Sequence, residues 1–421
     1  MIDLKALRED PDSFRGPLVR RGVQEQTIHQ LLTIDQRRRA VMTQAQDLRA
    51  EQKQFGRRIG HASGDERPAL IAASKKVSDQ IQDLEAAEAD LEQQQTQILV
   101  TIPNLPHPDA PDGVDDEDAV ELEQFGTMPS FDFEPLDHVA LGEALGILDI
   151  ERAVKVSGSR FAFLLGDAVF LEFALVRYAM QAIADHGFIP VIPPVLTRDE
   201  ALFGTAFLPG SADQIYQVPE DDLYLVGTAE VPLAGMHADE IFEPEQLPLR
   251  YGGFSTCFRR EAGTYGKDTS GIFRVHQFDK VEMFSWVRPE DSWDEHVGLK
   301  DIQRQILSGL GLHGRIVDIA VGDLGDSAAR KYDLEVWLPG QQRYRELTSA
   351  SNCTDYQARR LRARYRTEDG TETVHTLNGT ACAVGRTIIA VLETHQQADG
   401  SVAVPEVLQP YMGKDRLTAR T

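Results

Sequence analysis

Two heptad patterns separated by a turn constrain this chain more strongly than any other feature of its sequence. The first pattern consists of Ile34, Val41, Leu48 and Phe55, and the second of Leu70, Val77, Leu84, Leu91 and Ile98. Apolar residues repeated every seven positions are typical of long helices packed in a coiled coil. The segment 60–68 between them holds two glycines and a proline, which favour a turn. We therefore expect one long antiparallel helical hairpin whose turn is centred between residues 62 and 63.

The two expected helices differ in charge. Basic residues outnumber acidic ones in 27–60, whereas acidic residues outnumber basic ones in 61–101. Ion pairs between the helices would explain this pattern, and so would a basic helix that faces a polyanion. The sequence favours the ion pairs but leaves both explanations open. The basic residues concerned are Arg37, Arg38, Arg39, Arg49, Lys53, Arg57 and Arg58.

Composition excludes several classes of protein. The chain of 421 residues has a formal net charge of −24, which argues against a protein that coats nucleic acid nonspecifically. Its three cysteines are far apart, so they predict neither a disulfide framework nor zinc ligands, and a reducing cytoplasm fits best. Neither a secretory signal nor an apolar run long enough to span a membrane is evident, so we expect no membrane association.

Composition also changes along the chain. Prolines and acidic residues are concentrated directly after the second heptad pattern, and strand and helix patterns alternate beyond them. Such a change is typical of a boundary between domains. We therefore expect an arm at 1–102, an acidic proline-rich linker at 103–124 and a globular domain at 125–421.

The globular domain holds two expected strands, 249–261 and 277–287, joined by a connection with three glycines. The connection is much longer than an ordinary hairpin loop, and such loops are often functional. Strand alternation places Arg259 and Glu261 on one face, and Glu282 of the second strand could approach them. A ligand site and an internal ion pair explain these charges equally well.

Other segments carry polar groups in similar settings. We expect a strand at 342–349 with Tyr344, Glu346 and Thr348 on one face. Arginines alternate with other residues in 360–366, which predicts an amphipathic surface strand.

Two helix starts complete the pattern. The segment 374–393 is expected to begin as a strand, turn at Asn378-Gly379 and continue as a helix that carries Arg386, and such a helix start can bind an anion. Thr228-Ala229-Glu230 opens another helix, where Thr and Glu also act as ordinary stabilising caps. Together, these features point to a site for a phosphate ester and an amine.

Three segments resemble the signature motifs of class II aminoacyl-tRNA synthetases. FRREAGTYGKDTSGIFRVHQFDKVEMF looks like motif 2, NGTACAVGRTIIAVLE looks like motif 3, and the helix ending at Gly187 before Pro193-Pro194 looks like motif 1. The forms DLYLVGTAEVPL, YDLEVWLPGQ, SNCTDYQARR and IPNLPHPD resemble bacterial-type seryl-tRNA synthetases in particular. The likeness extends over almost the whole chain, including the hairpin.

The resemblance implies an α+β fold, with an antiparallel β-sheet flanked by helices and an N-terminal coiled-coil hairpin. It implies a ligase that activates L-serine with ATP to seryl-adenylate, releases pyrophosphate and transfers serine to the 3′ end of tRNA(Ser), and also to tRNA(Sec) where that tRNA exists. Mg²⁺ bound with ATP and a homodimer are implied, and zinc is not expected.

The resemblance also assigns residues. Arg259 would grip the α-phosphate and Arg386 would clamp the adenine and the phosphates. The ATP positions as a whole are Arg259, Arg260, Glu261, Val275, Glu346, Leu347, Thr348, Ser349 and Arg386, and those that would hold Mg²⁺ are Glu346 and Ser349. The serine positions are Thr228, Ala229, Glu230, Glu282 and Thr380, where Glu282 would accept the α-ammonium. The basic residues of the first hairpin helix become candidates for tRNA binding.

Some features keep other interpretations open. Thr380-Ala381-Cys382 stands where Ser-Gly-Leu is common in the family, a change that bears on the tightness of the pocket. A synthetase-like ligase that loads a carrier protein would lack the arm, and a non-catalytic RNA-binding paralogue would not need the full set of charged residues. A specialised second copy, retained for resistance to a seryl-adenylate mimic, is a further alternative to a housekeeping enzyme.

Overall fold

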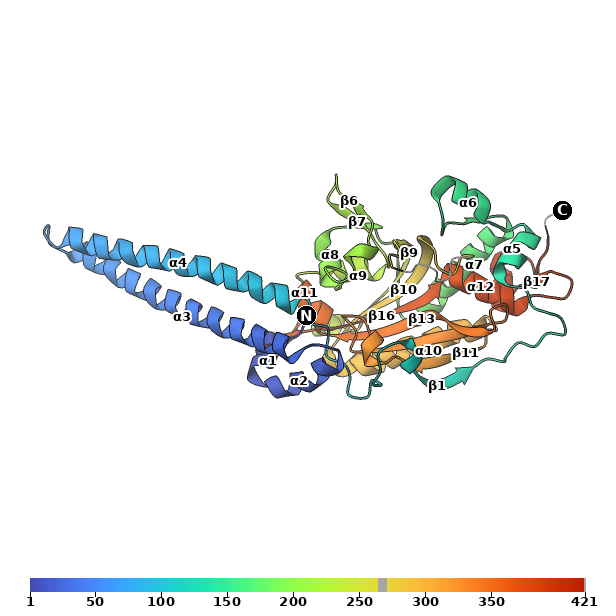
Figure 1. Cartoon of the computed structure of the whole chain (residues 1–421), viewed down its shortest axis with the longest axis horizontal. Coiled ribbons are helices and arrows are strands. Elements are labelled where there is room, and N and C mark those ends of the chain that lie inside the picture. The colour runs from blue at the N-terminus through green and yellow to red at the C-terminus, as the bar shows by residue number, and fades with distance from the viewer. Residues whose placement is uncertain (264–270, 420–421) are drawn as a thin grey trace. The chain divides into compact units, whose positions relative to one another are not determined.

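The computed structural model describes residues 1–263 and 271–419 (Figure 1). The chain divides into two compact units, one comprising Ile2–Pro103 and the other comprising Asn104–Thr421 together with Met1. Over the described ranges, no helix combines the length and apolar character that crossing a membrane requires.

The first unit is built on two long helices, α3 (Glu25–His61) and α4 (Arg67–Leu99), which run side by side in Figure 1. The predicted helical hairpin is therefore confirmed. The connecting residues 62–66 place the centre of the turn at residue 64, slightly later than the heptad patterns predict. Two short helices, α1 (Leu4–Glu9) and α2 (Pro11–Arg20), precede the hairpin.

A buried carboxylate joins three helices of this unit. Asp35 of α3 is only 5% exposed and accepts hydrogen bonds from Arg39 (2.9 Å), from Arg8 of α1 (3.3 Å) and from Gln95 of α4 (3.3 Å). A buried charge is tolerated when it is paired and hydrogen-bonded in this way. Asp35 therefore fixes α1 and α4 to the same part of α3.

From Asn104 onward, the segment expected to be a linker is part of the second unit. The Asn104 side-chain amide donates to the carbonyl oxygens of Cys353 (2.8 Å) and Ser327 (2.9 Å). Farther along, β1 (Val120–Phe125) pairs antiparallel with β11 (Gly314–Asp318). The acidic, proline-rich composition of 103–124 favoured a free connection, but hydrogen bonds to distant strands hold the segment against the sheet.

An eight-stranded sheet forms the centre of the second unit, with the order β1-β11-β12-β13-β16-β10-β9-β4. Neighbouring strands are antiparallel except β4 and β9, which run parallel. This antiparallel-dominated sheet confirms the predicted α+β class. The strands not yet defined are β4 (Ile189–Val191), β9 (Leu249–Phe258), β10 (Gln277–Val287), β12 (Arg330–Leu338), β13 (Arg343–Thr354) and β16 (His375–Ala383).

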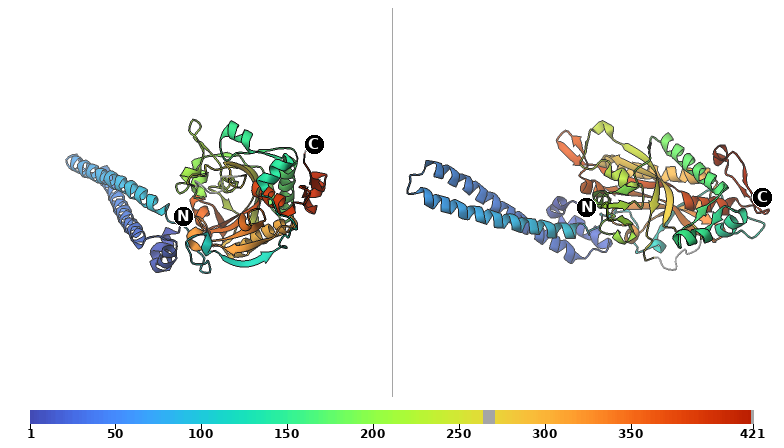
Figure 2. Two further views of the ribbon diagram at one scale, coloured as in Figure 1. Left: turned by 45° about the vertical axis from the view of Figure 1, so that its right-hand side comes forward. Right: turned by 90° about the horizontal axis from the view of Figure 1, so that it is seen from above.

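Three long helices pack against this sheet (Figures 1 and 2). They are α7 (Asp167–Asp185), α10 (Ser292–Gly309) and α12 (Val384–His395). Their apolar faces and the sheet share one core, which buries residues such as Leu175, Ile306 and Ile388. Burial of apolar surface on this scale is the main stabilising contribution to the fold. The helix expected at 167–186 and the strand expected at 277–287 are both confirmed.

The turn predicted at Asn378-Gly379 is wrong, because β16 continues through both residues. A side chain at Gly379 would place its Cβ 3.3 Å from Gln303 Nε2 and 3.4 Å from Met283 Cε. Glycine here lets α10 and β10 approach the strand closely.

The strand predicted at 360–366 is also wrong in its first half. Helix α11 (Tyr356–Leu361) occupies this position, and only β14 (Arg364–Thr367) is extended. The Arg360 guanidinium is buried and donates to the carbonyl oxygens of Phe203 (3.1 Å) and Leu208 (3.2 Å). Arg360 is therefore present because it makes a buried tertiary contact, and not because it lies on the solvent-facing side of a strand.

The remaining elements are short. The helices are α5 (His138–Leu145), α6 (Ile150–Ser157), α8 (Asp199–Gly204), α9 (Glu230–Gly235) and α13 (Gln409–Met412). The strands are β2 (Leu148–Asp149), β3 (Phe163–Leu164), β5 (Leu196–Thr197), β6 (Gln217–Val218), β7 (Leu223–Leu225), β8 (Ile241–Phe242), β15 (Gly370–Thr373), β17 (Val402–Ala403) and β18 (Arg416–Leu417).

Candidate active site

A cavity of about 210 Å³ lies over the middle strands of the sheet. Most of the residues predicted for a phosphate and amine site meet there, although they come from five separate segments of the chain. Those that line the cavity are Thr228, Glu230, Arg259, Glu261, Val275, Glu282, Glu346, Ser349, Thr380 and Arg386. Charged and polar groups converging in a hollow are the usual sign of a ligand site.

Strand alternation explains how β10 contributes to the cavity. Lys280 and Glu282 face the cavity, whereas Val281 and Met283 face the apolar core on the other side of the sheet. Successive side chains of a strand point to opposite faces, so one strand can serve both surfaces.

A β-bulge in β13 decides which of its residues reach the cavity. Leu334 of β12 is opposite Thr348 and Glu335 is opposite Glu346, so Leu347 is an extra residue in β13. Bulges change the direction of side chains next to functional sites. Glu346 and Ser349 therefore share the cavity face, whereas Thr348 is buried elsewhere, and the prediction that Glu346 and Thr348 share a face is wrong.

Helix α10 supports β13 and β16 from the other face of the sheet. The Gln303 side-chain amide donates to the carbonyl oxygens of Ser349 in β13 (2.7 Å) and Thr380 in β16 (3.0 Å). Both residues turn their side chains into the cavity. A single buried side chain therefore fixes the spacing between two cavity-lining positions.

One end of the cavity is acidic and buried. Glu230 Oε1 accepts hydrogen bonds from Gln357 Nε2 (2.7 Å) and Asn378 Nδ2 (3.0 Å). Burial, and then the nearby charge of Glu282, raise the pKa of Glu230 to about 7. The two carboxyl groups form a receptor suited to a small ammonium group.

Lys280 lies between these carboxyl groups and Thr228. It is 7% exposed, forms an ion pair with Glu282 and donates to Thr228 Oγ1 (2.7 Å). The same hydroxyl oxygen accepts a hydrogen bond from the Glu230 backbone N–H (3.2 Å). Because both acceptor positions of Thr228 are used, its own proton is directed away from Lys280.

The other end of the cavity is rich in arginine. Arg386 Nη1 donates to the Glu346 carbonyl oxygen (2.8 Å) and pairs with Glu346 Oε2 (3.2 Å). Its guanidinium carbon lies 4.5 Å from the centre of the Phe273 ring, and that of Arg345 lies 3.6 Å from the same centre. Burial alone would raise the pKa of Glu346, but Arg386 and Lys331 outweigh it and hold the pKa below its ordinary value. Glu346 therefore stays anionic.

The predicted motif 2 residues lie just beyond the end of β9. Arg259 Nε donates to the Gly227 carbonyl oxygen (3.2 Å), and its guanidinium lies over the Phe278 ring (5.3 Å). Glu261 pairs with Arg274 Nη1 (2.7 Å), a partner that the sequence did not reveal. The middle of the glycine-containing connection, residues 264–270, lies outside the described residues.

Four predicted positions do not belong to the described lining of this cavity. The Arg260 guanidinium lies over the Tyr216 ring (5.6 Å). Ala229 and Leu347 belong to the apolar cores, and Thr348 is buried. Each of them adjoins a lining residue in sequence, so every position predicted for ATP or serine either lines this cavity or is next to a residue that does.

Comparisons with known proteins agree with this geometry. A family model described as "Seryl-tRNA synthetase N-terminal domain" matches residues 1–106, and one described as "tRNA synthetase class II core domain (G, H, P, S and T)" matches residues 215–395. A serine–tRNA ligase of Thermobifida fusca is 52% identical over 419 residues, covering 99% of each chain. One of Streptomyces coelicolor is 53% identical over 418 residues, covering 98% of each. The chain belongs to the seryl-tRNA synthetase family.

Solved structures of seryl-tRNA synthetases are similar over the whole chain. One from Pyrococcus horikoshii, complexed with ATP, is 41% identical, has a TM-score of 0.95 and covers 100% of both chains. A cytoplasmic serine–tRNA ligase from Naegleria fowleri, complexed with AMP, is 33% identical, has a TM-score of 0.90 and covers 100% of this chain and 99% of that one. The family and the class II fold implied by the sequence are thus confirmed.

Sequence reasoning missed nine residues that line this cavity, which are Phe207, Ile272, Phe273, Arg274, Phe278, Lys280, Asn378, Ala383 and Gly385. Lys280 could have been found, because it precedes Glu282 by two positions on a strand and therefore shares its face. Asn378 could not, since the Asn-Gly pair predicted a turn there.

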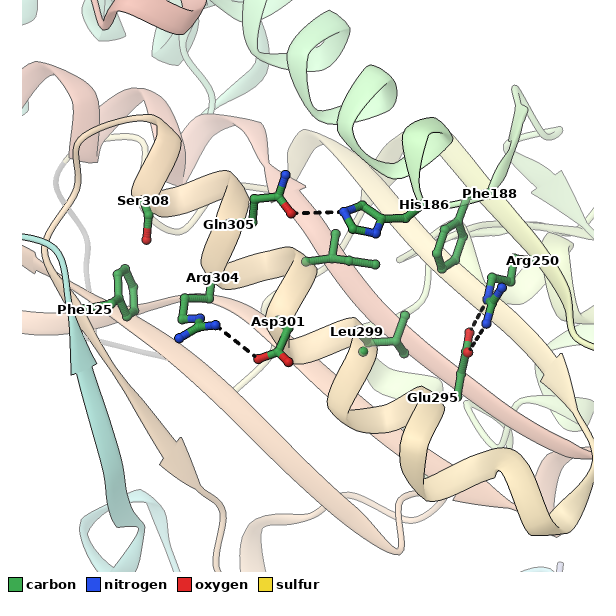
Figure 3. A pocket seen from close by; sticks show the side chains of 12 residues that line it. Phe125, His186, Phe188, Arg250, Glu295, Leu299, Asp301, Arg304, Gln305 and Ser308 are labelled. Atoms are coloured by element: carbon green, nitrogen blue, oxygen red, sulfur yellow. Dashed lines mark hydrogen bonds and ion pairs between the residues drawn. The ribbon is translucent and has the colours of Figure 1, made fainter.

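A larger hollow of about 610 Å³ lies beside α10 (Figure 3). Arg250 and Glu295 pair with each other at its rim (2.7 and 2.5 Å), and His186 bonds Gln305 (3.0 Å). The residues that the synthetase motifs identify line the smaller cavity and not this one.

Proposed function

We propose that this chain activates L-serine with ATP to seryl-adenylate and transfers serine to the 3′ end of tRNA(Ser). The observation that carries the proposal is that one cavity gathers the guanidinium groups of Arg259 and Arg386 and the buried carboxyl groups of Glu230 and Glu282. Such a cavity can hold a polyphosphate and an amino acid so that the serine carboxylate attacks the α-phosphate. Alignment and neutralisation of charge are the main requirements of that reaction.

At the arginine-rich end, Arg259 and Arg386 are proposed to bind the phosphates of ATP, and the Phe273 ring to pack against the adenine. Guanidinium groups suit phosphate because they donate several hydrogen bonds in a fixed planar arrangement. Glu261 and Val275 line the same cavity and are proposed to contact the nucleotide. Arg260, Leu347 and Thr348 would act through their backbone or through their neighbours.

At the carboxylate end, Glu282 and Glu230 are proposed to bind the α-ammonium of serine, while Thr228 and Thr380 contribute hydroxyl groups. A site built to hydrogen-bond the substrate hydroxyl rejects alanine strongly, because its own polar groups would be left unpaired. Ala229 would shape this subsite as the residue that precedes helix α9.

The residues also fit a Mg²⁺ ion that arrives with ATP. Glu346 supplies an anionic carboxylate, Ser349 supplies a hydroxyl group, and hard oxygen ligands of this kind suit Mg²⁺. Among the described residues, no three His, Cys, Asp or Glu side chains form a metal site by themselves. The phosphates would therefore complete the coordination, and the ion would neutralise part of their charge.

The basic residues of α3 divide into two groups. Arg38 pairs with Glu92 (2.6 Å), Arg49 pairs with Glu85 (2.7 Å), and Arg39 pairs with Asp35 (2.9 Å). These pairs support the explanation by internal ion pairs for part of the helix. The exposed residues Arg37, Lys53, Arg57 and Arg58 form none of the ion pairs observed in the described chain, so we assign tRNA backbone binding chiefly to them. Serylation of tRNA(Sec) belongs to the same proposal.

We further propose a homodimer in the cytoplasm. Phe170 and Phe173 of α7 are 59% and 62% exposed, and Ile192 after β4 is 81% exposed. Large apolar side chains grouped on a surface mark a protein–protein interface. Both elements belong to the segment that resembles motif 1.

Serine-dependent exchange of pyrophosphate into ATP, followed by charging of tRNA(Ser), tests this proposal. Exchange with serine and not with alanine or threonine is expected, and charging should follow when tRNA is added. Well-folded protein that shows no serine-dependent exchange would contradict the proposed activity. Exchange without charging would instead favour a ligase that loads a different acceptor.

A further inference from the structure

A buried histidine outside the cavity connects two parts of the nucleotide end. His138 begins α5 and is 4% exposed, and Glu393 in the last part of α12 is fully buried. The distance from His138 Nδ1 to Glu393 Oε1 is 3.0 Å. On its other side, the imidazole receives a hydrogen bond from the Ile272 backbone N–H to Nε2 (3.3 Å).

These two contacts determine the protonation of the ring. A backbone N–H can only donate, so His138 Nε2 must be the unprotonated nitrogen. Nδ1 therefore carries the proton and donates it to Glu393. The Glu393 carboxylate is held in turn by the backbone N–H groups of His138 (3.1 Å) and Gly340 (3.0 Å), so each member of the group is fixed by its neighbours.

Gly271 provides independent evidence that the imidazole is closely fitted to this segment. A Cβ atom at Gly271 would lie 2.0 Å from His138 Nε2 and 2.8 Å from Cε1. The backbone at this position also has a φ of +76°, which glycine adopts without strain. The ring thus occupies the space that any other side chain at 271 would need.

The hydrogen bond from the Ile272 N–H to His138 affects the end of the cavity proposed to bind ATP, because Ile272 directly precedes Phe273. The guanidinium carbons of Arg386 and Arg345 both lie over the Phe273 ring, 4.5 and 3.6 Å from its centre. Arg386 stands in the first turn of α12, and Glu393 lies two turns farther along the same helix. The chain at 271–273 is therefore joined to α12 twice, once through the Phe273 ring and once through His138.

We propose that His138 is a positioning residue for the nucleotide: through Ile272 it sets the place of the Phe273 ring beneath Arg386. The inference rests on the proposed assignment of Phe273 and Arg386 to ATP. If His138 Nε2 no longer accepts the hydrogen bond from the Ile272 N–H, the Phe273 ring is free to move away from Arg386. The carboxylate end of the cavity keeps all its contacts. The effect is consequently expected on ATP and not on serine.

The test compares His138→Gln with His138→Asn in the full-length protein, using pyrophosphate exchange. A glutamine amide reaches as far as Nε2 and can still accept from Ile272, whereas asparagine is too short. We expect His138→Asn to raise KM for ATP by about tenfold, the effect of losing one buried hydrogen bond, with KM for serine changed less than about twofold. His138→Gln should restore KM for ATP to within about threefold of the wild-type value.

His395→Gln is the matched control, because His395 also lies on α12 and its Nε2 contacts the Leu310 carbonyl oxygen (2.8 Å) away from the cavity. Thermal unfolding of all three variants separates lost stability from lost positioning. Equal KM values for ATP in the Gln and Asn variants, or equal increases for ATP and serine, would overturn the inference. Wild-type protein without serine-dependent exchange would instead overturn the proposed function on which it rests.

Discussion

The helical hairpin and the cavity over the sheet use charged residues in opposite ways. In the hairpin, Arg49 and Glu85 are each about half exposed, so their ion pair is surrounded by water. In the cavity, Lys280 and Glu282 are almost completely buried and depend on each other. An exposed pair contributes little to stability, whereas removal of one partner from a buried pair leaves an uncompensated charge. The placement of charge therefore decides its effect, and a net charge of −24 does not reveal the nature of the partner.

The largest effect should follow from Arg259→Ala. It removes a guanidinium group proposed to stabilise the charge that develops on the α-phosphate, and exchange should fall by at least about 100-fold. Arg49→Ala in the hairpin is the matched control and should leave exchange unchanged. Comparable losses in both variants would show that the cavity has no special role.

Lys280→Met should affect both stability and serine binding. Without the ammonium group, Glu282 remains buried without its partner, which costs about 3–5 kcal/mol in the free energy of unfolding. Denaturant unfolding measures this loss. Exchange kinetics at a temperature where the variant is folded should show a changed KM for serine, because Lys280 pairs with Glu282, the proposed acceptor of the α-ammonium. Lys280→Arg keeps the charge and should recover part of both. A variant as stable as the wild type would contradict the assigned ion pair.

Simultaneous neutralisation of Arg37, Lys53, Arg57 and Arg58 should weaken tRNA binding and leave exchange unchanged. Each lost phosphate contact reduces the slope of log K against log salt by somewhat less than one unit. A filter-binding titration at several salt concentrations measures this slope. Neutralising Arg38 and Arg49 instead is the internal comparison, because their charges are already paired. An equal change of slope in both variants would refute the division of the basic residues into two groups.

The pH dependence of serine binding should reflect Glu230. Its pKa is raised to about 7, so the carboxyl group is largely neutral at pH 6 and largely anionic at pH 8. Because an anion binds the α-ammonium better, KM for serine should fall by a few-fold as the pH rises through 7. Glu230→Gln should remove this dependence, and a wild-type KM that is flat over the range would contradict the role of Glu230.

Patterns within one element predicted the hairpin and the central strands well. The heptads around Leu48 and Leu84 report the packing of two adjacent helices, and the apolar residues on both faces of 277–287 indicate an interior strand. In both cases, the pattern that allowed the prediction consists of residues that are close in sequence or regularly spaced.

The errors arose where distant residues override local preference. The Asn378-Gly379 pair favours a turn, but the close approach of Gln303 explains the glycine equally well. The bulge at Leu347 follows from pairing with β12, which no local pattern encodes. Most of the site residues came from the resemblance, while the spacing of Arg259, Glu261 and Glu282 alone left a ligand site and an ion pair equally possible.

The Gln303 hydrogen bonds have a consequence for how substitutions outside the cavity affect inhibitor binding. They set the separation of Ser349 and Thr380 from a helix that lies behind the sheet. Substitutions in α10 can therefore alter how a seryl-adenylate mimic fits while every residue facing it stays the same. Comparisons of drug-sensitive and drug-resistant copies that examine only the cavity wall would overlook such changes.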